Sequence, residues 1–488
     1  MLCYYQLLLQ PVIIRYFITI DAQDVPLSSG SKHLHMTPLE KRAALSLAGI
    51  FSIRMLGLFM LLPVISLYQD KLIGATPALI GLAIGVYGFT QSLLQIPFGL
   101  VSDRIGRKPV IFIGLLLFAL GSVIAAQSDT IYGIIAGRAV QGCGAIAAAI
   151  MALAADLTRE EHRTKAMALI GMSIGAAFAL ALVVGPLLDH WIGLSGLFWF
   201  TAAMAIAGIV VLIFIVPTPV SRRIHGDAEP VPSQFRRILK DTQLMRLDAG
   251  IFLLHMILTA SFVVFPQVLE KELGLASFNH WKVYLPVLLL SVMTMIPFII
   301  MAERGHKIKK VFIGGVFFIG LSQLGLSFMH GRFWAAVFLL FVFFTAFNLL
   351  EASLPSLVSK MAPTESKGTA MGFYSSSQFM GAFIGGSLGG LLLGQAGYSG
   401  VFLLSAGMAL LWLLIASTMK EPQYLASYLL NIGNLEPDQA TLLATELNNI
   451  PGVAEAVVIT KDQVAYLKVD NEILDEDSLL KYSVSPRD

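Results

Sequence analysis

The sequence predicts an all-α membrane protein with twelve transmembrane helices in two bundles of six, followed by a small α+β domain. Three observations support this prediction. Of the 488 residues, 56% are hydrophobic and only 13% are charged, whereas soluble domains carry about 25% charged residues. Apolar segments long enough to cross a bilayer recur along most of the chain. After Lys420 the composition becomes acidic and resembles that of a soluble domain.

The twelve spans follow from the apolar segments. A crossing needs about 20 mostly apolar residues, and each must be helical because an open strand would leave backbone groups unsatisfied in lipid. The segments are 43–67, 78–98, 110–127, 131–155, 166–188, 194–216, 246–268, 283–302, 311–329, 333–359, 368–394 and 398–418.

The orientation follows from lysine and arginine. If the N-terminus lies inside, the inner loops hold roughly 18 basic residues and the outer loops roughly 4. This asymmetry predicts a multi-pass protein with both termini in the cytoplasm. The two cysteines, Cys3 and Cys143, are too few for a disulfide framework or a cysteine-based metal site. We expect no metal and no cofactor.

The chain divides into five parts. Residues 1–42 form an N-terminal extension, and we expect translation to begin at Met36 because Met36–Arg42 resembles a short inner flank. A bundle at 43–216, a proline-rich cytoplasmic linker at 217–245, a second bundle at 246–420 and a cytosolic domain at 421–488 follow. The two bundles look related, since Asp103-Arg104 after the second span is echoed by Glu303-Arg304 after the eighth.

The C-terminal segment resembles a ferredoxin-like domain. It carries 11 acids against 4 bases between residues 424 and 488. Its pattern predicts strand, helix, hairpin and helix, at Tyr424–Ile432, Asp438–Asn448, Ala454–Thr460 with Val464–Asp470, and Asp475–Tyr482. We expect this domain to dock on the basic 217–245 linker and to regulate the bundle, with an ion or metabolite as a candidate ligand. The alternative is a merely tethered domain whose acidity keeps it soluble.

The most informative motif lies between the second and third spans, where Gly99-Leu-Val-Ser-Asp-Arg-Ile-Gly-Arg-Lys108 predicts a tight loop. It resembles the motif between helices 2 and 3 of the major facilitator superfamily. The first span, Arg54-Met-Leu-Gly-Leu-Phe-Met-Leu-Leu-Pro63, and the C-terminal domain narrow the resemblance to the YajR-type subgroup of the drug:proton antiporters. The resemblance covers residues 40–482. It implies proton-coupled export by alternating access across a bacterial inner membrane.

The resemblance suggests a conformational switch made of Gly99, Asp103, Arg104, Gly106, Arg107, Lys108 and Asp156. Asp103 is expected to face the start of the eleventh span, near Gly368 and Thr369, and Arg107 to pair with Asp156. We interpret this cluster as a latch that holds the outward-open state. The alternative is that the basic residues only set topology, but Asp103 has no such purpose.

The resemblance also implies that spans 1, 4, 7 and 10 line the cavity. The candidates for cavity lining or proton coupling are Arg54, Arg138, Gln141, His255, Asn348 and Glu351, with Gln91, Gln95 and Gln378 beside them. Ionisable residues inside a span are costly, which makes them functional candidates. Glu351 is the candidate proton carrier, or alternatively a structural partner near the Pro355 kink. Arg138 could instead extend its charged end to the membrane surface.

One antiporter signature is only partly present. Gly185-Pro186 matches it, but Ala181 stands where the family has a glycine, which leaves the direction of transport open. Proton-coupled export of a small amphiphilic or drug-like compound is the leading interpretation. A facilitator for a sugar or other nutrient, and a non-transporting membrane sensor, are the alternatives. An enzyme is disfavoured because no catalytic triad, metal-ligand cluster or phosphate-binding loop is present. We expect a monomer whose partners are a small-molecule substrate, protons and the lipid bilayer, and no nucleic acid.

Overall fold

The computed structural model describes residues 36–218, 234–305, 307–363, 366–421, 426–433, 436–460 and 464–470, with 473–475, 478–479, 481 and 482. Residues 1–35 of the expected extension at 1–42 and residues 219–233 of the expected 217–245 linker therefore lie outside the described residues. The first bundle comprises α2 (Pro38–Phe59), α3 (Leu62–Ile65), η1 (Ser66–Tyr68), α4 (Pro77–Ile105), α5 (Arg107–Ala126), α6 (Ile131–Cys143), α7 (Ala147–Leu157) and α8 (Glu160–Phe214). The second comprises α9 (Phe235–Lys240), α10 (Thr242–Gln267), η3 (Val268–Glu272), η4 (Ser277–Asn279), α11 (Trp281–Arg304), α12 (Ile308–Met329), α13 (Phe333–Met361) and α14 (Lys367–Ser417).

Among the described residues, ten helices are long and apolar enough to cross a membrane, and two of them supply two crossings each. Helices α8 and α14 contain 55 and 51 residues, whereas about 20 suffice for one crossing. Each is interrupted by one glycine in the left-handed region, Gly193 at φ 65° and Gly397 at φ 64°. A residue with a Cβ adopts that conformation only at a cost. The predicted boundaries at 188–194 and 394–398 fall on these breaks, and the twelve-span fold is confirmed.

The two bundles meet along α4 and α14. A Cβ added at Gly85 of α4 would lie 2.7 Å from the carbonyl oxygen of Phe383, and one added at Gly390 of α14 would lie 2.8 Å from Cα of Gly81 in α4. Glycine at these positions therefore allows the backbones to approach closely, as small residues do in membrane helix pairs. Near the middle of the same interface, the Ser92 hydroxyl donates to the Ser376 carbonyl oxygen over 2.8 Å.

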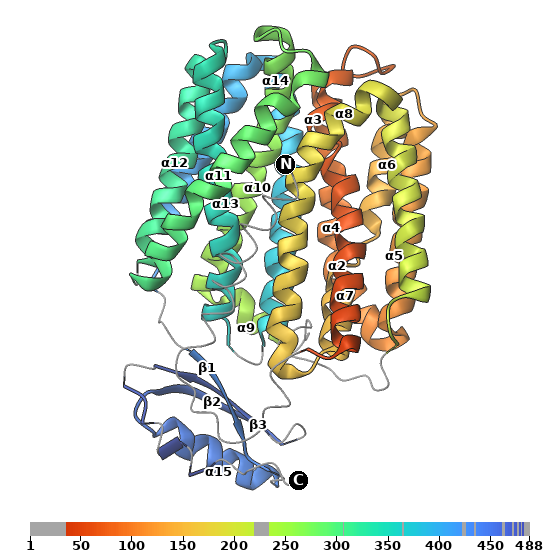
Figure 1. Cartoon of the computed structure of the whole chain (residues 1–488). Coiled ribbons are helices and arrows are strands. Elements are labelled where there is room, and N and C mark those ends of the chain that lie inside the picture. Colours follow the sequence, from red (N-terminus) through yellow and green to blue (C-terminus); the bar gives the residue numbers. More distant parts are fainter. Residues whose placement is uncertain are drawn as a thin grey trace.

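The bundle has two distinct ends. We call the end beside the C-terminal domain, where Ile105 and Met361 end their helices, the domain end, and the opposite end the far end (Figure 1). At the far end an ion pair between Lys271 and Asp70, at 2.8 Å, joins the second bundle to the first. The rings of His190 and Phe278 also meet there, with centroids 4.6 Å apart. These contacts close the two bundles against each other at the far end.

The C-terminal domain is a three-stranded antiparallel sheet with one helix across it (Figure 1). The strands are β1 (Ala426–Asn431), β2 (Val453–Ile459) and β3 (Val464–Val469), in the order β1-β3-β2, and the helix is α15 (Pro437–Asn448). The predicted strand, helix and hairpin are present, and this order fits the first four elements of a ferredoxin-like fold. The expected second helix lies partly outside the described residues. Leu447 of α15 packs on Ala465 and Leu467 of β3 to form the core.

The C-terminal domain contacts the bundle at the end of α13. The ammonium of Lys468 in β3 donates to the carbonyl oxygen of Ala362 over 2.7 Å and pairs with Glu455 of β2 at 3.3 Å. The expected docking surface was the 217–245 linker, of which residues 219–233 are not described, so that contact stays a prediction. The contact that the structure provides is with the α13–α14 connection instead.

Candidate functional site

The 99–108 motif is almost entirely helical. The sequence predicted a tight loop, but residues 99–105 form the last two turns of α4, and α5 begins at Arg107. Only Gly106 breaks the helix, at φ 109° and ψ 151°, a conformation that side chains oppose. The prediction of a loop is therefore wrong. Gly106 alone makes the turn, and the residues before it continue the helix α4.

Arg107 is the centre of the polar cluster around this turn. Its guanidinium bonds to the Asp103 carboxylate and donates to the Ser102 hydroxyl over 2.9 Å. Its Nε lies 3.4 Å from Asp156 of α7, so the predicted pair of Arg107 and Asp156 is present. The Arg107 and Asp156 side chains are only 4% and 0% exposed, which removes them from the screening of bulk water. Ser102 was missed, because a lone serine at a helix end has no signature in the sequence.

The other members of the motif lie outside this cluster. Lys108 donates to the carbonyl oxygen of Val216 over 2.6 Å and so ties α5 to the end of α8. Arg104 is exposed, and Gly99 lies inside α4, where its carbonyl accepts from Ser102. The approach of Asp103 to Gly368 and Thr369 stays a prediction, because the partner that the structure gives Asp103 is Arg107.

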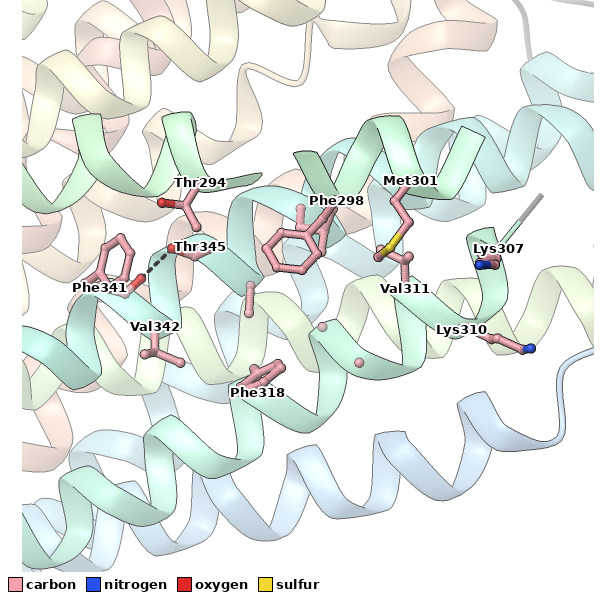
Figure 2. Close-up of a pocket in the computed structure, with 14 residues that line it drawn as sticks. Thr294, Phe298, Met301, Lys307, Lys310, Val311, Phe318, Phe341, Val342 and Thr345 are labelled. Atoms are coloured by element: carbon pink, nitrogen blue, oxygen red, sulfur yellow. Dashed lines mark hydrogen bonds between the residues drawn. The ribbon is translucent and has the colours of Figure 1, made fainter. Parts of the chain in front are cut away.

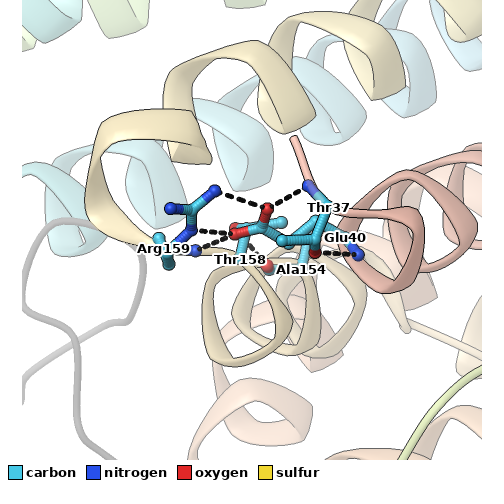
Figure 3. Close-up of polar contacts among 5 residues, drawn as sticks. All are labelled: Thr37, Glu40, Ala154, Thr158 and Arg159. Carbon is cyan, nitrogen blue, oxygen red and sulfur yellow. Dashed lines mark hydrogen bonds and ion pairs between the residues drawn. The ribbon is translucent and has the colours of Figure 1, made fainter. Parts of the chain in front are cut away.

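A second ion pair at the domain end was missed. The Arg159 backbone N–H and Nε each donate to one oxygen of Glu40 over 2.9 Å, and the other oxygen accepts from the Thr37 N–H at 2.8 Å (Figure 3). Figure 3 also shows Thr158 bonding back to Ala154 in the preceding turn, at 2.6 Å. Thr37-x-x-Glu40 is a capping box, so the contact between Thr37 and Glu40 was visible in the sequence. The partner lies 119 residues away, which no local pattern predicts.

Two arginines, Arg54 and Arg138, are buried in the first bundle, and both lie against the ring of Tyr87. Arg138 donates to the Gln141 side-chain oxygen over 3.0 Å and to the Ala83 carbonyl oxygen over 3.4 Å. Arg54 donates from Nη2 to Gln91, whereas its Nε and Nη1 are buried and have no hydrogen-bond partner within the described part of the chain. A buried, partly unsatisfied guanidinium is costly, which fits a group held for function.

The second bundle contains an acid–base cluster. Gln378 of α14 lies between Glu351 of α13 and His255 of α10, and donates to a carboxylate oxygen of Glu351 over 3.2 Å and to the imidazole over 2.8 Å. The second carboxylate oxygen of Glu351 is buried without a hydrogen-bond partner among the described residues, and lies 3.9 Å from His255 Nε2. The structure thus brings Glu351, His255 and Gln378 together. Asn348 lies apart, since its amide donates to Ser291 of α11 over 2.9 Å.

Sequence reasoning missed a second acid near this cluster. Asp248 of α10 is 4% exposed. Tyr374 of α14 lies within electrostatic range of both Asp248 and Glu351, and its hydroxyl is buried without a hydrogen-bond partner among the described residues. In sequence Asp248 lies at the edge of a predicted span, where an acid is ordinary. Only the packing of α14 against α10 reveals it as a buried carboxyl group.

No group of three or more His, Cys, Asp or Glu side chains is placed to hold a metal ion in the described ranges. The chemistry that these side chains offer is proton binding and ion pairing within a helical bundle. Such groups can move protons and switch contacts, and they lack the paired nucleophile and base of a hydrolytic site.

Comparisons with known proteins agree with this arrangement. The family model of the Major Facilitator Superfamily matches residues 47–372 and 247–427. The inner membrane transport protein YajR of Escherichia coli (strain K12) is 48% identical over 439 residues, which cover 90% of this chain and 96% of that protein. The multidrug resistance protein MdtH of Proteus mirabilis is 24% identical over 69% of this chain and 83% of its own.

Solved structures share the fold at lower identity. The human organic anion transporter MFSD10 has a TM-score of 0.60 at 18% identity and covers 78% of this chain and all of its own. A bacterial homologue of the human lysosomal transporter Spinster, in an inward-facing and occupied conformation, has a TM-score of 0.63 at 11% identity, with 78% and 96% covered. At these identities the likeness shows the fold alone.

Proposed function

The chain belongs to the major facilitator superfamily and is a membrane transporter, and from this premise we propose that it is a proton-coupled exporter of small amphiphilic or drug-like compounds. The protein would work by alternating access, in which two bundles rock about a central substrate site. The multidrug resistance protein among its relatives favours export. We further propose that the domain end is cytoplasmic, since the basic residues between spans gather there.

The observation that carries the proposal is the contact of Gln378 with Glu351 and His255. A carboxyl group inside a membrane bundle can exist as a neutral acid or as a carboxylate, and the two forms need different partners. The Glu351 oxygen that has no hydrogen-bond partner among the described residues can bind a proton, and the imidazole of His255, 3.9 Å away, can also bind a proton. Because the cluster joins α10, α13 and α14, its protonation would alter contacts among three helices of one bundle.

The Arg107 cluster supplies the proposed switch. It ties α4, α5 and α7 together at the domain end through the ion pairs of Arg107 with Asp103 and Asp156. One charge moving through 100 mV is worth about 2.3 kcal/mol. One proton could therefore shift an equilibrium between two bundle arrangements that differ by a few ion-pair contacts.

The C-terminal domain would regulate this cycle through Lys468. Its ammonium lies at the C-terminal end of α13, the helix that carries Glu351. A cation there complements the helix dipole and satisfies a free carbonyl oxygen. This contact also favours the second candidate function, a membrane sensor in which the domain reports on the state of the bundle.

The test is proton movement in proteoliposomes with an imposed pH gradient, over a panel of amphiphilic compounds. We expect wild type to release protons in a compound-dependent way and Glu351→Gln to lose this release while keeping compound counterflow. Asp103→Asn should slow both activities. Glu270→Gln, which changes an acid at the far end of the same bundle, serves as the matched control. Counterflow by wild type without proton movement would contradict the coupling, and silence across the panel would favour the sensor.

A further inference from the structure

A groove with a volume of 330 Å³ lies within the second bundle, between α11, α12 and α13 (Figure 2). Its lining is apolar along most of its length, with Phe298 of α11, Phe318 of α12 and Val342 of α13 on its walls. All three helices belong to the same bundle, so the groove is separate from the α4–α14 interface between the bundles.

Two adjacent glycines of α12 produce the hollow. A Cβ added at Gly314 would meet no other atom within 4 Å, whereas one added at Gly315 would touch Leu350 at 3.0 Å. Gly314 thus borders open space and Gly315 permits α12 to pack against α13. Phe298 and Phe318 are 40% and 47% exposed, so the groove opens sideways onto the apolar surface of the spans. That surface faces lipid, which makes a hydrocarbon chain the natural occupant.

Two lysines stand at the domain end of the groove (Figure 2). Lys307 and Lys310 are both exposed, and neither ammonium forms an ion pair or hydrogen bond with a residue that the structure describes. Lys309, one residue before Lys310, does not line the groove. The groove therefore combines an apolar channel with a positive end, which complements a molecule with an apolar chain and an anionic head.

The dimensions fit one leaflet of a bilayer. From Lys307 to Phe318 the helix advances by about 16 Å, at about 1.5 Å per residue. Half of the hydrocarbon core is about 15 Å thick. We propose that this groove binds one acyl chain of an anionic phospholipid, whose phosphate lies against Lys307 and Lys310. Basic pockets between transmembrane helices at the cytoplasmic side are suited to such headgroups.

The proposal is tested by native mass spectrometry of the purified full-length protein, released from detergent with equal amounts of dioleoyl phosphatidylglycerol and dioleoyl phosphatidylcholine. The two lipids share their chains and differ in headgroup charge. We expect wild type to retain phosphatidylglycerol preferentially. Lys307→Gln with Lys310→Gln should lower that preference about 25-fold, since each lysine near an anionic headgroup adds about a fivefold preference.

Two matched controls separate this site from general lipid adhesion. Lys309→Gln removes the same charge from the same turn and should keep the preference. Gly314→Leu should fill the groove and abolish the retention of phosphatidylglycerol. Gly407→Leu should not, although a Cβ added at this α14 position also meets no atom within 4 Å. Size-exclusion profiles confirm that each variant is folded. Equal retention of the two lipids by wild type, retention of neither, or an equal loss in Lys309→Gln or Gly407→Leu would overturn the proposal.

Discussion

The guanidinium groups of Arg54 and Arg138 both contact one aromatic ring, with their central carbons 5.7 and 5.0 Å from the centroid of Tyr87. Both arginines are completely or almost completely buried. They differ in how they are satisfied, because Arg138 bonds to Gln141 and Ala83 whereas two nitrogens of Arg54 have no partner in the described part of the chain. Because the two arginines are equally buried but only Arg138 has its hydrogen bonds made, replacing each of them should change the stability of the protein in opposite directions.

Arg54→Met should raise the thermal stability of the purified protein, and Arg138→Met should lower it. Replacing a buried, poorly compensated charge by an apolar side chain of similar size often stabilises a protein by about 1–4 kcal/mol. Removing Arg138 instead leaves the Gln141 side-chain oxygen without its donor, at a cost of about 1–3 kcal/mol. Unfolding midpoints in the same detergent measure both. A loss of stability in Arg54→Met would show that Arg54 is a structural residue.

Arg107→Gln should destabilise the first bundle by about 3 kcal/mol, because it removes the cation that faces the buried carboxylate of Asp156. Asp156→Asn alone should also destabilise it, and the double variant should lose less than the two single losses together. Arg104→Gln, an exposed change in the same turn, should stay within about 0.5 kcal/mol of wild type. Thermal unfolding of the four variants measures the coupling free energy between Arg107 and Asp156. If the loss in the double variant equals the sum of the losses in the two single variants, the two residues are not coupled.

Tyr374→Phe should slow compound-driven proton release without changing counterflow. The Tyr374 hydroxyl lies within electrostatic range of both Glu351 and Asp248. A phenol can both donate and accept a hydrogen bond, which suits it to a proton path between these two carboxyl groups. Asp248→Asn should have the same effect. Tyr284→Phe is the matched control, since the hydroxyl of Tyr284 is also buried and has no hydrogen-bond partner in the described ranges. Equal rates for the two tyrosine variants would remove Tyr374 and Asp248 from the proton path.

Hydropathy and charge were sufficient to predict the twelve spans and the small acidic domain. The breaks at Gly193 and Gly397 fell where the apolar periodicity was interrupted, because a helix that turns back at the membrane surface needs a residue tolerant of positive φ. The helical 99–105 segment was not predicted. Charged residues suggest a loop, yet a helix can extend past the bilayer while its side chains remain hydrated.

The candidate site was predicted only in part. The pair of Arg107 with Asp156 came from a family resemblance. Glu351 and His255 were each singled out from the resemblance and from the cost of charge in lipid, but their proximity to each other was not predicted. Asp248 was missed because its burial depends on α14, more than a hundred residues later in the chain. The bonding of Asn348 to Ser291 was missed for a similar reason, since residue type does not show which neighbouring helix a side chain faces.

The contact of Lys468 with the end of α13 leads to the last prediction. Its ammonium donates to the Ala362 carbonyl oxygen at 2.7 Å and, more weakly, to that of Lys360 at 3.4 Å, while Lys360 itself pairs with Glu303 of α11 at 2.9 Å. The domain, α13 and α11 are thus joined at one point. A cation at a helix C-terminus is worth about 0.3–1 kcal/mol.

Lys468→Gln should therefore loosen the domain and shift the bundle away from the state that is closed at the far end, by up to about fivefold in the equilibrium constant. The expected result is faster proteolytic release of the C-terminal domain together with an altered transport rate. Lys481→Gln removes an exposed lysine of the same domain and should change neither quantity. If both variants release the domain at the wild-type rate, Lys468 does not hold it. If release quickens while transport is unchanged, the domain is tethered through Lys468 but does not regulate the bundle.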